Sequence, residues 1–250
     1  MSSYFFLTGA TGLLGNYLLR DLLLADQPVA VLARSNRRLS ARQRIEVLLS
    51  HWDRELGRKL PRPVVLEGDI TQPDLGLDAH DLRWTAEYCG AVIHNAASLT
   101  FHATSSEGEP FRSNVGGTKN VLEFARQANI LEFHHVSTAY IAGLRHGRIL
   151  ESEVDVGQTL GNDYETSKLA AEKLVRSTDF IDPPTVYRPG IIIGDSQTGF
   201  TTTYHGFYAA LQLVHTLAQA HEPDETGLIC ASNVRLNLNG DETKHLVPVD

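Results

Sequence analysis

The feature that most constrains this chain is a run of glycines near its start. Residues 4–15 read YFFLTGATGLLG, a short apolar stretch that leads into Gly9, Gly12 and Gly15 and then into a helical pattern, LLGNYLLRDLLLA. A glycine turn between a strand and a helix lets backbone N–H groups approach a pyrophosphate at the positive end of the helix. The same glycines would also suit a tight turn for steric reasons alone. The GxxGxxG spacing favours a dinucleotide site and needs support from the rest of the chain.

Length and composition indicate one globular domain. The 250 residues can bury a single large core, and 42% of them are apolar. A net charge of −8 argues against a nucleic-acid partner and against an anionic membrane surface. We find no apolar run of membrane-spanning length and no basic signal-peptide region, so we expect a cytoplasmic location. Cys89 and Cys230 form no CxxC, and the histidines form no HExxH, so we expect no disulfide framework and no metal site.

Apolar runs and helical patterns alternate along most of the chain. The expected strands are Tyr4–Thr8, Pro28–Ala33, Pro63–Glu67, Ala91–Asn95, Glu132–Ser137 and Thr185–Arg188. The expected helices lie at about 13–25, 39–57, 115–128 and 164–177. Strands separated by helices imply right-handed crossovers. The sequence therefore predicts an α/β fold, a Rossmann-type doubly wound parallel sheet with helices on both faces.

The alternation fades after Pro189. A helix is expected near 204–220, and NVRLNLNG at 233–240 has the pattern of a polar strand. We interpret residues 1–250 as a single dinucleotide-binding domain whose small C-terminal region, about 190–250, forms the substrate side of a cleft. That region ends at HLVPVD, and we expect it to be incomplete at the C-terminus.

A second pattern concerns acid–base chemistry. Tyr164 and Lys168 form a YxxxK pair on one face of an expected helix, and the strand before it ends in Ser137 and Thr138. A tyrosine with a pKa near 10 is a poor acid at neutral pH, and a neighbouring lysine with an oxidised nicotinamide is expected to lower that pKa. Tyrosine and lysine at this spacing also occur in ordinary amphipathic helices. The hydroxyl of Thr138 makes the catalytic interpretation stronger.

The end of the second expected strand bears on cofactor choice. There the chain has Arg34 where an acidic residue would accept hydrogen bonds from an NAD ribose. An arginine instead offers a planar fork of donors to a 2′-phosphate, and Ser35 and Arg44 add to this polar, basic surface. A solvated arginine run on a surface loop is the alternative. We expect NADPH, which suits a reductive reaction.

Short motifs along the whole chain resemble the extended short-chain dehydrogenase/reductase superfamily. They are TGATGLLG at 8–15, GDI at 68–70, HNAAS at 94–98, NVGGT at 114–118, VSTAYIAG at 136–143, YETSK at 164–168 and YRPGIIIG at 187–194. Within it, the chain resembles the thioester reductase and fatty acyl-CoA reductase (male-sterility-type) branch. This narrower resemblance lies in the Arg-flanked segment 37–62, GDITQPDLGL, NAASLTF, YRPGIIIGDSQTG and HLVPVD.

The resemblance implies roles for individual residues. It implies a catalytic set of Thr138, Tyr164 and Lys168, supported by Asn114 from its helix. Thr138 stands where many relatives have serine, and threonine keeps the hydroxyl. The implied cofactor contacts run from the pyrophosphate through the adenine to the nicotinamide: Gly9, Thr11, Gly12, Leu13, Leu14, Gly15, Arg34, Ser35, Arg44, Asp69, Ile70, Asn95, Ala96, Ala97, Tyr164, Lys168, Pro189, Gly190, Ile191 and Ile192.

The expected activity is NADPH-dependent reduction of an acyl thioester, held on coenzyme A or an acyl carrier protein, to an aldehyde. Ketone reduction of the hydroxysteroid or flavonoid type, or sugar-nucleotide epimerase or dehydratase chemistry, stays open because those enzymes share most of the motifs. A non-catalytic redox sensor that binds NADPH is a further alternative. Such sensors typically lose the tyrosine–lysine pair that this chain keeps. The acyl donor and the oligomeric state cannot be derived from the residues.

Overall fold

The fold is known from a computed structural model, which describes residues 3–202, 207–219, 225 and 245–250. Its centre is a six-stranded parallel sheet in the order β3-β2-β1-β4-β5-β6. The strands are β1 (Tyr4–Thr8), β2 (Val29–Ala33), β3 (Val64–Glu67), β4 (Cys89–His94), β5 (Glu132–Val136) and β6 (Thr185–Tyr187). The expected Rossmann-type doubly wound sheet is confirmed.

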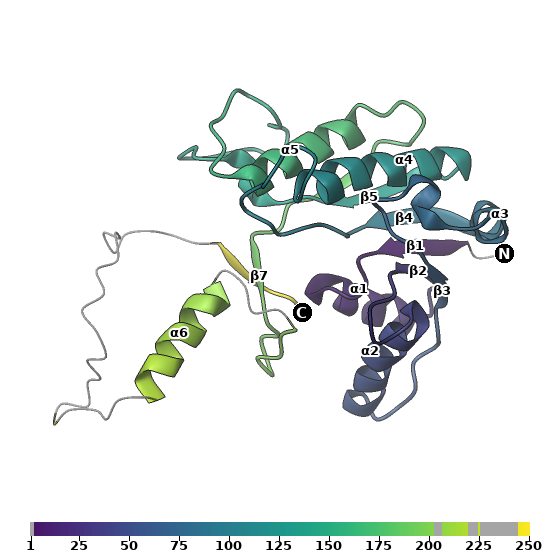
Figure 1. The fold of residues 1–250 in the computed structure, drawn as a ribbon, viewed down its shortest axis with the longest axis horizontal. Helices are drawn as coiled ribbons and strands as arrows, with labels where there is room; N and C mark the ends of the chain where they lie inside the picture. Colours follow the sequence, from purple (N-terminus) through teal and green to yellow (C-terminus); the bar gives the residue numbers. More distant parts are fainter. Residues whose placement is uncertain (1–2, 203–206, 220–224, 226–244) are drawn as a thin grey trace.

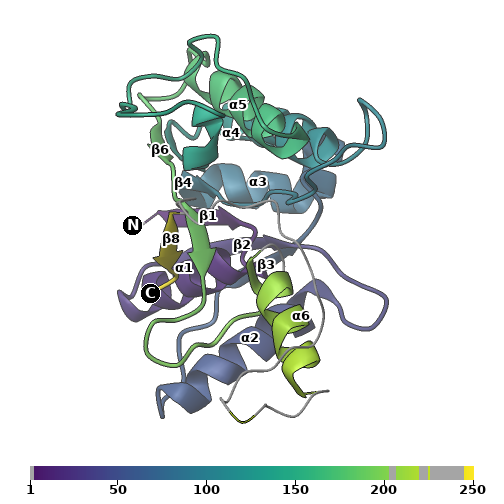
Figure 2. The same cartoon turned by 90° about the vertical axis from the view of Figure 1, so that its left-hand side faces the viewer.

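Two layers of helices cover the sheet (Figures 1 and 2). One face carries α1 (Leu13–Leu24) and α2 (Ala41–Glu55). The other carries α3 (Ala79–Tyr88), α4 (Thr118–Gln127) and α5 (Asp163–Arg176). Successive side chains of a strand point to opposite faces of the sheet and so pack against different helix layers. Phe6 packs against Phe124 of α4, with ring centroids 4.5 Å apart. Its neighbour Leu7 packs in the cluster that contains Tyr17 and Trp52.

Short helices and a second small sheet lie at the carboxyl ends of the strands. Two 3-10 helices, η1 (Pro73–Gly76) and η3 (Ala139–Ala142), follow β3 and β5, and a π-helix, η2 (Arg112–Gly117), leads into α4. Beyond β6 the strand β7 (Ile191–Ile193) pairs in parallel with β8 (Leu246–Pro248). The helix α6 (Phe207–Gln219) falls within the expected 204–220. The strand-like run 233–240 lies outside the described residues.

Besides short elements such as the strands β7 and β8, the sequence analysis missed one α-helix, α3. Its residues, AHDLRWTAEY, include a single fully buried side chain, that of Thr85, so they carry little apolar periodicity. It begins where the Asp78 carboxylate accepts the backbone N–H groups of His80 and Asp81. Because α3 ends at Tyr88, the next strand starts at Cys89, two residues before the expected Ala91.

Candidate active site

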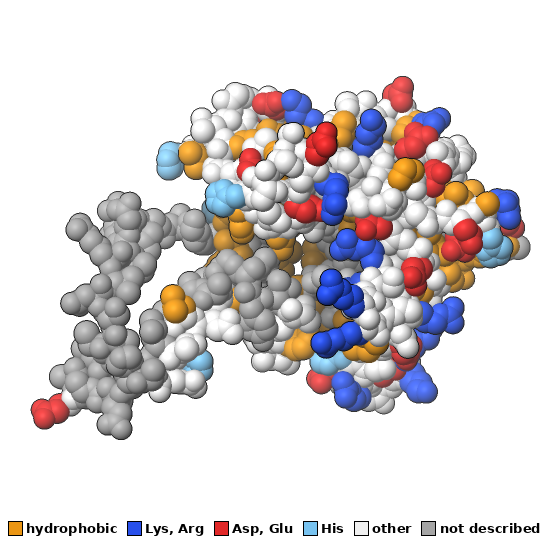
Figure 3. All heavy atoms as spheres, in the orientation of Figure 1, with side chains coloured by type: hydrophobic (Ala, Val, Ile, Leu, Met, Phe, Trp, Pro, Cys, Tyr) orange, Lys and Arg blue, Asp and Glu red, His pale blue; other side chains and the backbone are white. Residues whose placement is uncertain are grey.

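A cavity of about 640 Å³ opens at the carboxyl edge of the sheet. It is centred where the strand order reverses between β1 and β4, the point at which doubly wound sheets bind their ligands. Loops after β1, β2, β3, β4, β5 and β6 all contribute to its wall. Figure 3 shows Lys and Arg side chains gathered beside a hollow on this face, next to α2.

The glycine turn after β1 has the form that an anion site needs. Gly9 has φ +75°, and a Cβ there would lie 2.7 Å from the backbone nitrogen of Ala96. A Cβ on Gly15 would lie 2.1 Å from the carbonyl oxygen of Gly9, so α1 can approach the turn only with glycine at that position. Gly12 caps α1 without a side-chain bond, and Leu13 and Leu14 of its first turn line the cavity. This helix start fits a pyrophosphate held by backbone N–H groups.

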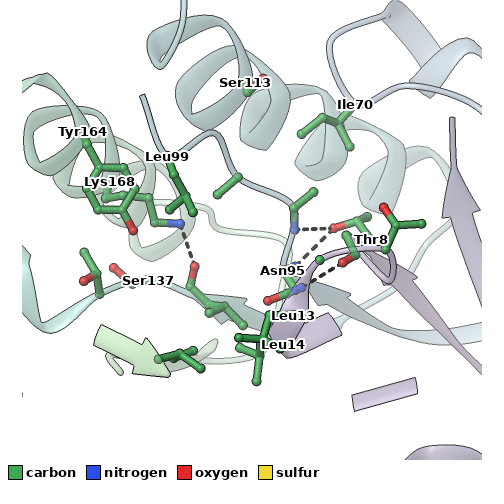
Figure 4. Close-up of a pocket in the computed structure, with 18 of the residues that line it drawn as sticks. Thr8, Leu13, Leu14, Ile70, Asn95, Leu99, Ser113, Ser137, Tyr164 and Lys168 are labelled. Carbon is green, nitrogen blue, oxygen red and sulfur yellow. Dashed lines mark hydrogen bonds between the residues drawn. The ribbon is translucent and has the colours of Figure 1, made fainter. Parts of the chain in front are cut away.

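The two halves of the sheet are braced at this turn (Figure 4). The Thr8 hydroxyl oxygen accepts the backbone N–H groups of Asn95 and Ala96 at 3.2 and 3.1 Å. The side-chain amide of Asn95 donates to the carbonyl oxygen of Gly9 at 3.2 Å. Both Asn95 and Ala96 line the cavity, so the turn after β1 and the loop after β4 form one rigid floor.

A buried histidine extends this brace toward Asn114. His94 is hydrogen-bonded through Nδ1 to the Thr8 hydroxyl (2.9 Å) and through Nε2 to the Thr118 hydroxyl (3.0 Å). Since Thr118 donates its own proton to the carbonyl oxygen of Asn114 (2.6 Å), the neutral ring carries its proton on Nε2 and accepts from Thr8 at Nδ1. Burial lowers the pKa of His94 to about 3, so the ring stays neutral at physiological pH.

Asn114 lies in the π-helix and is buried behind the cavity wall. Its side-chain oxygen accepts the N–H of Ser98 at 2.7 Å, and its amide donates to the Ser98 carbonyl and to the hydroxyl of Ser167. These bonds tie the loop after β4 to α5. Asn114 does not itself line the cavity, and a supporting role for it stays a prediction.

The far end of the cavity is basic. Arg34 follows β2, and its guanidinium lies 3.4 Å from the carboxylate of Asp69. Arg44 of α2 donates to the Arg34 carbonyl oxygen at 2.6 Å and to the Thr11 hydroxyl at 3.2 Å. Burial raises the pKa of Asp69, but hydrogen bonds from Thr71 and the charge of Arg34 outweigh it and hold that pKa below its usual value. An ionised Asp69 therefore orients a cation at this end.

The catalytic candidates converge at the opposite end. Asn162 accepts the N–H of Glu165 at 2.9 Å and so fixes the start of α5, which carries Tyr164 and Lys168 on its first two turns. Figure 4 shows the Tyr164 ring beside the Lys168 side chain, whose ammonium donates to the Val136 carbonyl oxygen at 2.7 Å. Both side chains line the cavity with Thr138.

Burial dominates the electrostatics of this cluster. Burial raises the pKa of Tyr164 to about 12, and its hydrogen bond with the Thr138 hydroxyl opposes that rise. Burial lowers the pKa of Lys168 to about 8, while the charge of Glu172 acts the other way. Burial is the largest cause of both shifts, because desolvation disfavours the charged form of each group. Tyr164 is accordingly held as a proton donor.

Most of the expected site residues line the one cavity. Three do not: Gly15 packs under the turn, Asn114 lies behind the wall, and Ser35 is exposed outside it. The structure adds lining residues that the sequence analysis did not single out as site residues: Thr8, Leu32, Ala33, Gly68, Leu99, Phe101, Ser113, Val136, Ser137, Tyr140, Asn162 and Glu165. Phe101 could have been predicted from the motifs, because it is the last residue of NAASLTF. Its ring meets that of Tyr164 edge-on at 5.8 Å.

Comparison with known proteins assigns the family. The family model described as "Male sterility protein" matches residues 7–234. The chain belongs to this family. The assignment confirms the expected branch of the extended short-chain dehydrogenase/reductase superfamily and an NAD(P)-dependent reductase domain. Among the described residues, no helix combines the length and the apolar character needed to cross a membrane.

Solved relatives of this male sterility protein family member point to reductase domains. The terminal R domain from the myxalamid PKS-NRPS biosynthetic pathway is 31% identical, with a TM-score of 0.73, over 99% of this chain and 59% of that one. The reductase (R) domain of a nonribosomal peptide synthetase from Mycobacterium tuberculosis is 25% identical, with a TM-score of 0.70, over 100% of this chain and 61% of that one.

The curated relatives are much longer than this chain. The isonitrile lipopeptide synthase of Mycobacterium tuberculosis is 32% identical over 76% of this chain and 8% of its own length. A nonribosomal peptide synthetase of Aspergillus flavus is 30% identical over 78% of this chain and 20% of its own length. The chain thus corresponds to a small part of these relatives.

Proposed function

We propose that this domain binds NADPH and reduces an acyl thioester, presented on a carrier protein or on coenzyme A, to an aldehyde. The observation that carries the proposal is the convergence of Tyr164, Thr138 and Lys168 at one end of a cavity whose other end presents Arg34 and Arg44. The similarity to the terminal R domain of a PKS-NRPS pathway supports a carrier-bound substrate.

We expect the cofactor to extend along the whole cavity. Backbone N–H groups at Leu13 and Leu14 would hold the pyrophosphate at the start of α1. Arg34 and Arg44 would bind the 2′-phosphate, which favours NADPH over NADH. Bound there, NADPH supplies the hydride for the carbonyl carbon of the substrate.

The chain's own residues then handle charge and protons. Tyr164 and Thr138 would donate hydrogen bonds to the carbonyl oxygen as negative charge develops on it. A phenol with a pKa of about 12 is protonated at neutral pH, so Tyr164 can pass its proton to that oxygen and give a hemithioacetal. Collapse of the hemithioacetal breaks the C–S bond and yields aldehyde and thiol. The thiolate departs readily because its conjugate thiol has a pKa of about 8.5.

The direct test supplies NADPH with a panel of acyl-CoA and carrier-bound acyl groups, and measures NADPH absorbance, aldehyde and free thiol. Release of one thiol per aldehyde formed supports the proposal. Reduction of simple ketones without thiol release would assign the domain to the ketone reductases instead. NADPH binding without turnover of any substrate would favour a redox sensor. Tyr164→Phe is the matched inactive control.

A further inference from the structure

A buried carboxylate lies directly behind the catalytic cluster. Glu172 stands on α5 one helical turn beyond Lys168, and its side chain is 0% exposed. It does not line the cavity, so the chemistry above makes no use of it. A buried charge is costly unless it is paired and hydrogen-bonded, and a fully buried glutamate therefore demands an explanation.

The first partner of Glu172 lies on the catalytic strand end. The Ser137 hydroxyl donates to Glu172 at 2.7 Å. On one side of Ser137 lies Val136, whose carbonyl oxygen accepts the Lys168 ammonium, and on the other lies Thr138, whose hydroxyl faces the cavity. The Glu172 carboxylate therefore holds Ser137 in place, and Ser137 lies between Val136 and Thr138, the two residues that the proposed reaction uses.

The second partner lies on the neighbouring strand end. Arg188 donates to Glu172 from Nη2 at 2.6 Å and from Nε at 3.1 Å, a two-point contact. The next residue, Pro189, lines the cavity, and its carbonyl oxygen accepts the N–H of Ala139 at 2.9 Å. Ser137 N–H also donates to the Tyr187 carbonyl oxygen at 2.7 Å. The ends of β5 and β6 are joined to each other and, through one carboxylate, to α5.

One buried anion meets several cations at the same place. The titratable and charged groups packed around Lys168 and Glu172 are His94, His135, Tyr164, Arg176 and Arg188. Burial lowers the pKa of His94 and that of His135, so both rings are neutral. Burial by itself raises the pKa of the Glu172 carboxyl, but hydrogen bonds from Arg188, from Ser137 and, at 2.7 Å, from Arg176 outweigh burial and keep it ionised. Glu172 is then the anion that faces a group of cations.

We propose that Glu172 is a positioning residue for hydride transfer: it locks the ends of β5 and β6 to α5 and places a negative charge one helical turn from the Lys168 ammonium. The proposal rests on the role given above to Lys168 and Thr138. It predicts two separable effects. Loss of the charge changes the titration of Lys168, and loss of the Ser137 bond changes the placement of Thr138.

The first experiment measures the titration of Lys168 directly. The chain has five lysines, so NMR of protein with ¹³C-labelled lysine gives few signals, and Lys168→Met assigns the one of interest. In Glu172→Gln the ammonium should titrate about one pH unit lower or more, since an opposite charge nearby has been removed. Glu123→Gln is the matched control, because Glu123 pairs with Arg126 on α4 but is exposed. The titration needs neither cofactor nor substrate, so it stands whether or not a thioester is reduced.

The second experiment measures single-turnover hydride transfer with a substrate that the panel above identifies. Ser137→Ala should lower the rate about tenfold to a hundredfold, through misplacement of Thr138, and leave the Lys168 titration unchanged. Glu172→Gln should lower the rate at least as much, and Glu123→Gln should not change it. The proposal is wrong if Lys168 titrates identically with and without the Glu172 charge, or if Ser137→Ala retains the wild-type rate. Should Glu172→Gln fail to fold, Ser137→Ala alone decides the positioning role.

Discussion

Arg34→Asp is the sharpest test of how the cavity selects its cofactor. The Arg34 side chain is 64% exposed, and its ion pair with Asp69 at 3.4 Å is long, so losing that pair should change folding stability by less than about 1 kcal/mol. A charge-assisted hydrogen bond to a 2′-phosphate is worth about 1.5–3 kcal/mol. NADPH affinity should therefore fall by roughly ten- to a hundredfold, and further because two carboxylates, at 34 and 69, would then face the phosphate.

NADH lacks the 2′-phosphate and should bind the Arg34→Asp variant as well as it binds the wild type, or better, since the new carboxylate can accept its ribose hydroxyls. Binding is measured by the fluorescence of each reduced cofactor at a fixed, moderate salt concentration. Arg34→Gln separates loss of the contact from added repulsion. Arg42→Asp makes the same charge change on α2 at a residue that does not line the cavity. It therefore controls for the long-range electrostatic effect of the charge change on cofactor binding. Equal losses for NADPH and NADH in Arg34→Asp would refute the reasoning.

Three further outcomes follow from the site. Tyr164→Phe should remove most hydride transfer in a stopped-flow assay and leave NADPH affinity within about tenfold, since a lost neutral hydrogen bond costs about 0.5–1.5 kcal/mol; near-normal turnover would show that another group is the acid. Because the protonated lysine is the form that would bind the ribose, NADPH affinity should fall as pH rises above about 8 in the wild type and stay flat in Lys168→Met. Gly15→Ala would place a methyl group 2.1 Å from the Gly9 carbonyl oxygen, so cofactor affinity and thermal stability should fall together; an unchanged melting temperature would contradict the close approach of α1.

The sheet and most of the site could be predicted because their signals are local. Each strand is a short apolar run bounded by turn residues, and parallel strands end at a common edge, so the motifs that follow them must meet. The resemblance of these motifs to the short-chain dehydrogenase/reductase superfamily implied site roles for Gly9, Asn95, Thr138 and Tyr164, and the structure lines one cavity with all four.

The remaining features depend on tertiary surroundings. The raised pKa of Tyr164 follows from burial by neighbouring elements, which its spacing from Lys168 cannot reveal. Glu172 looks like any glutamate on an amphipathic helix until β5 and β6 bring it Ser137 and Arg188. The helix α3 was missed because most of its side chains are not buried.

The reversal of strand order between β1 and β4 also divides the sequence into two consecutive segments, which contribute different ends of the cavity. Arg34, Arg44 and the glycine turn all precede residue 89, whereas Thr138, Tyr164 and Lys168 all follow it. On the roles proposed above, exchanging residues 1–88 for those of a relative would change the cofactor preference and keep the proton-donating groups. The junction is broad, because the β1–β4 ladder, the contact of Phe6 with Phe124 and the bonds of Thr8 to Asn95 and Ala96 all cross it. Such a chimera would therefore need parents whose residues match on both sides of β1 and β4.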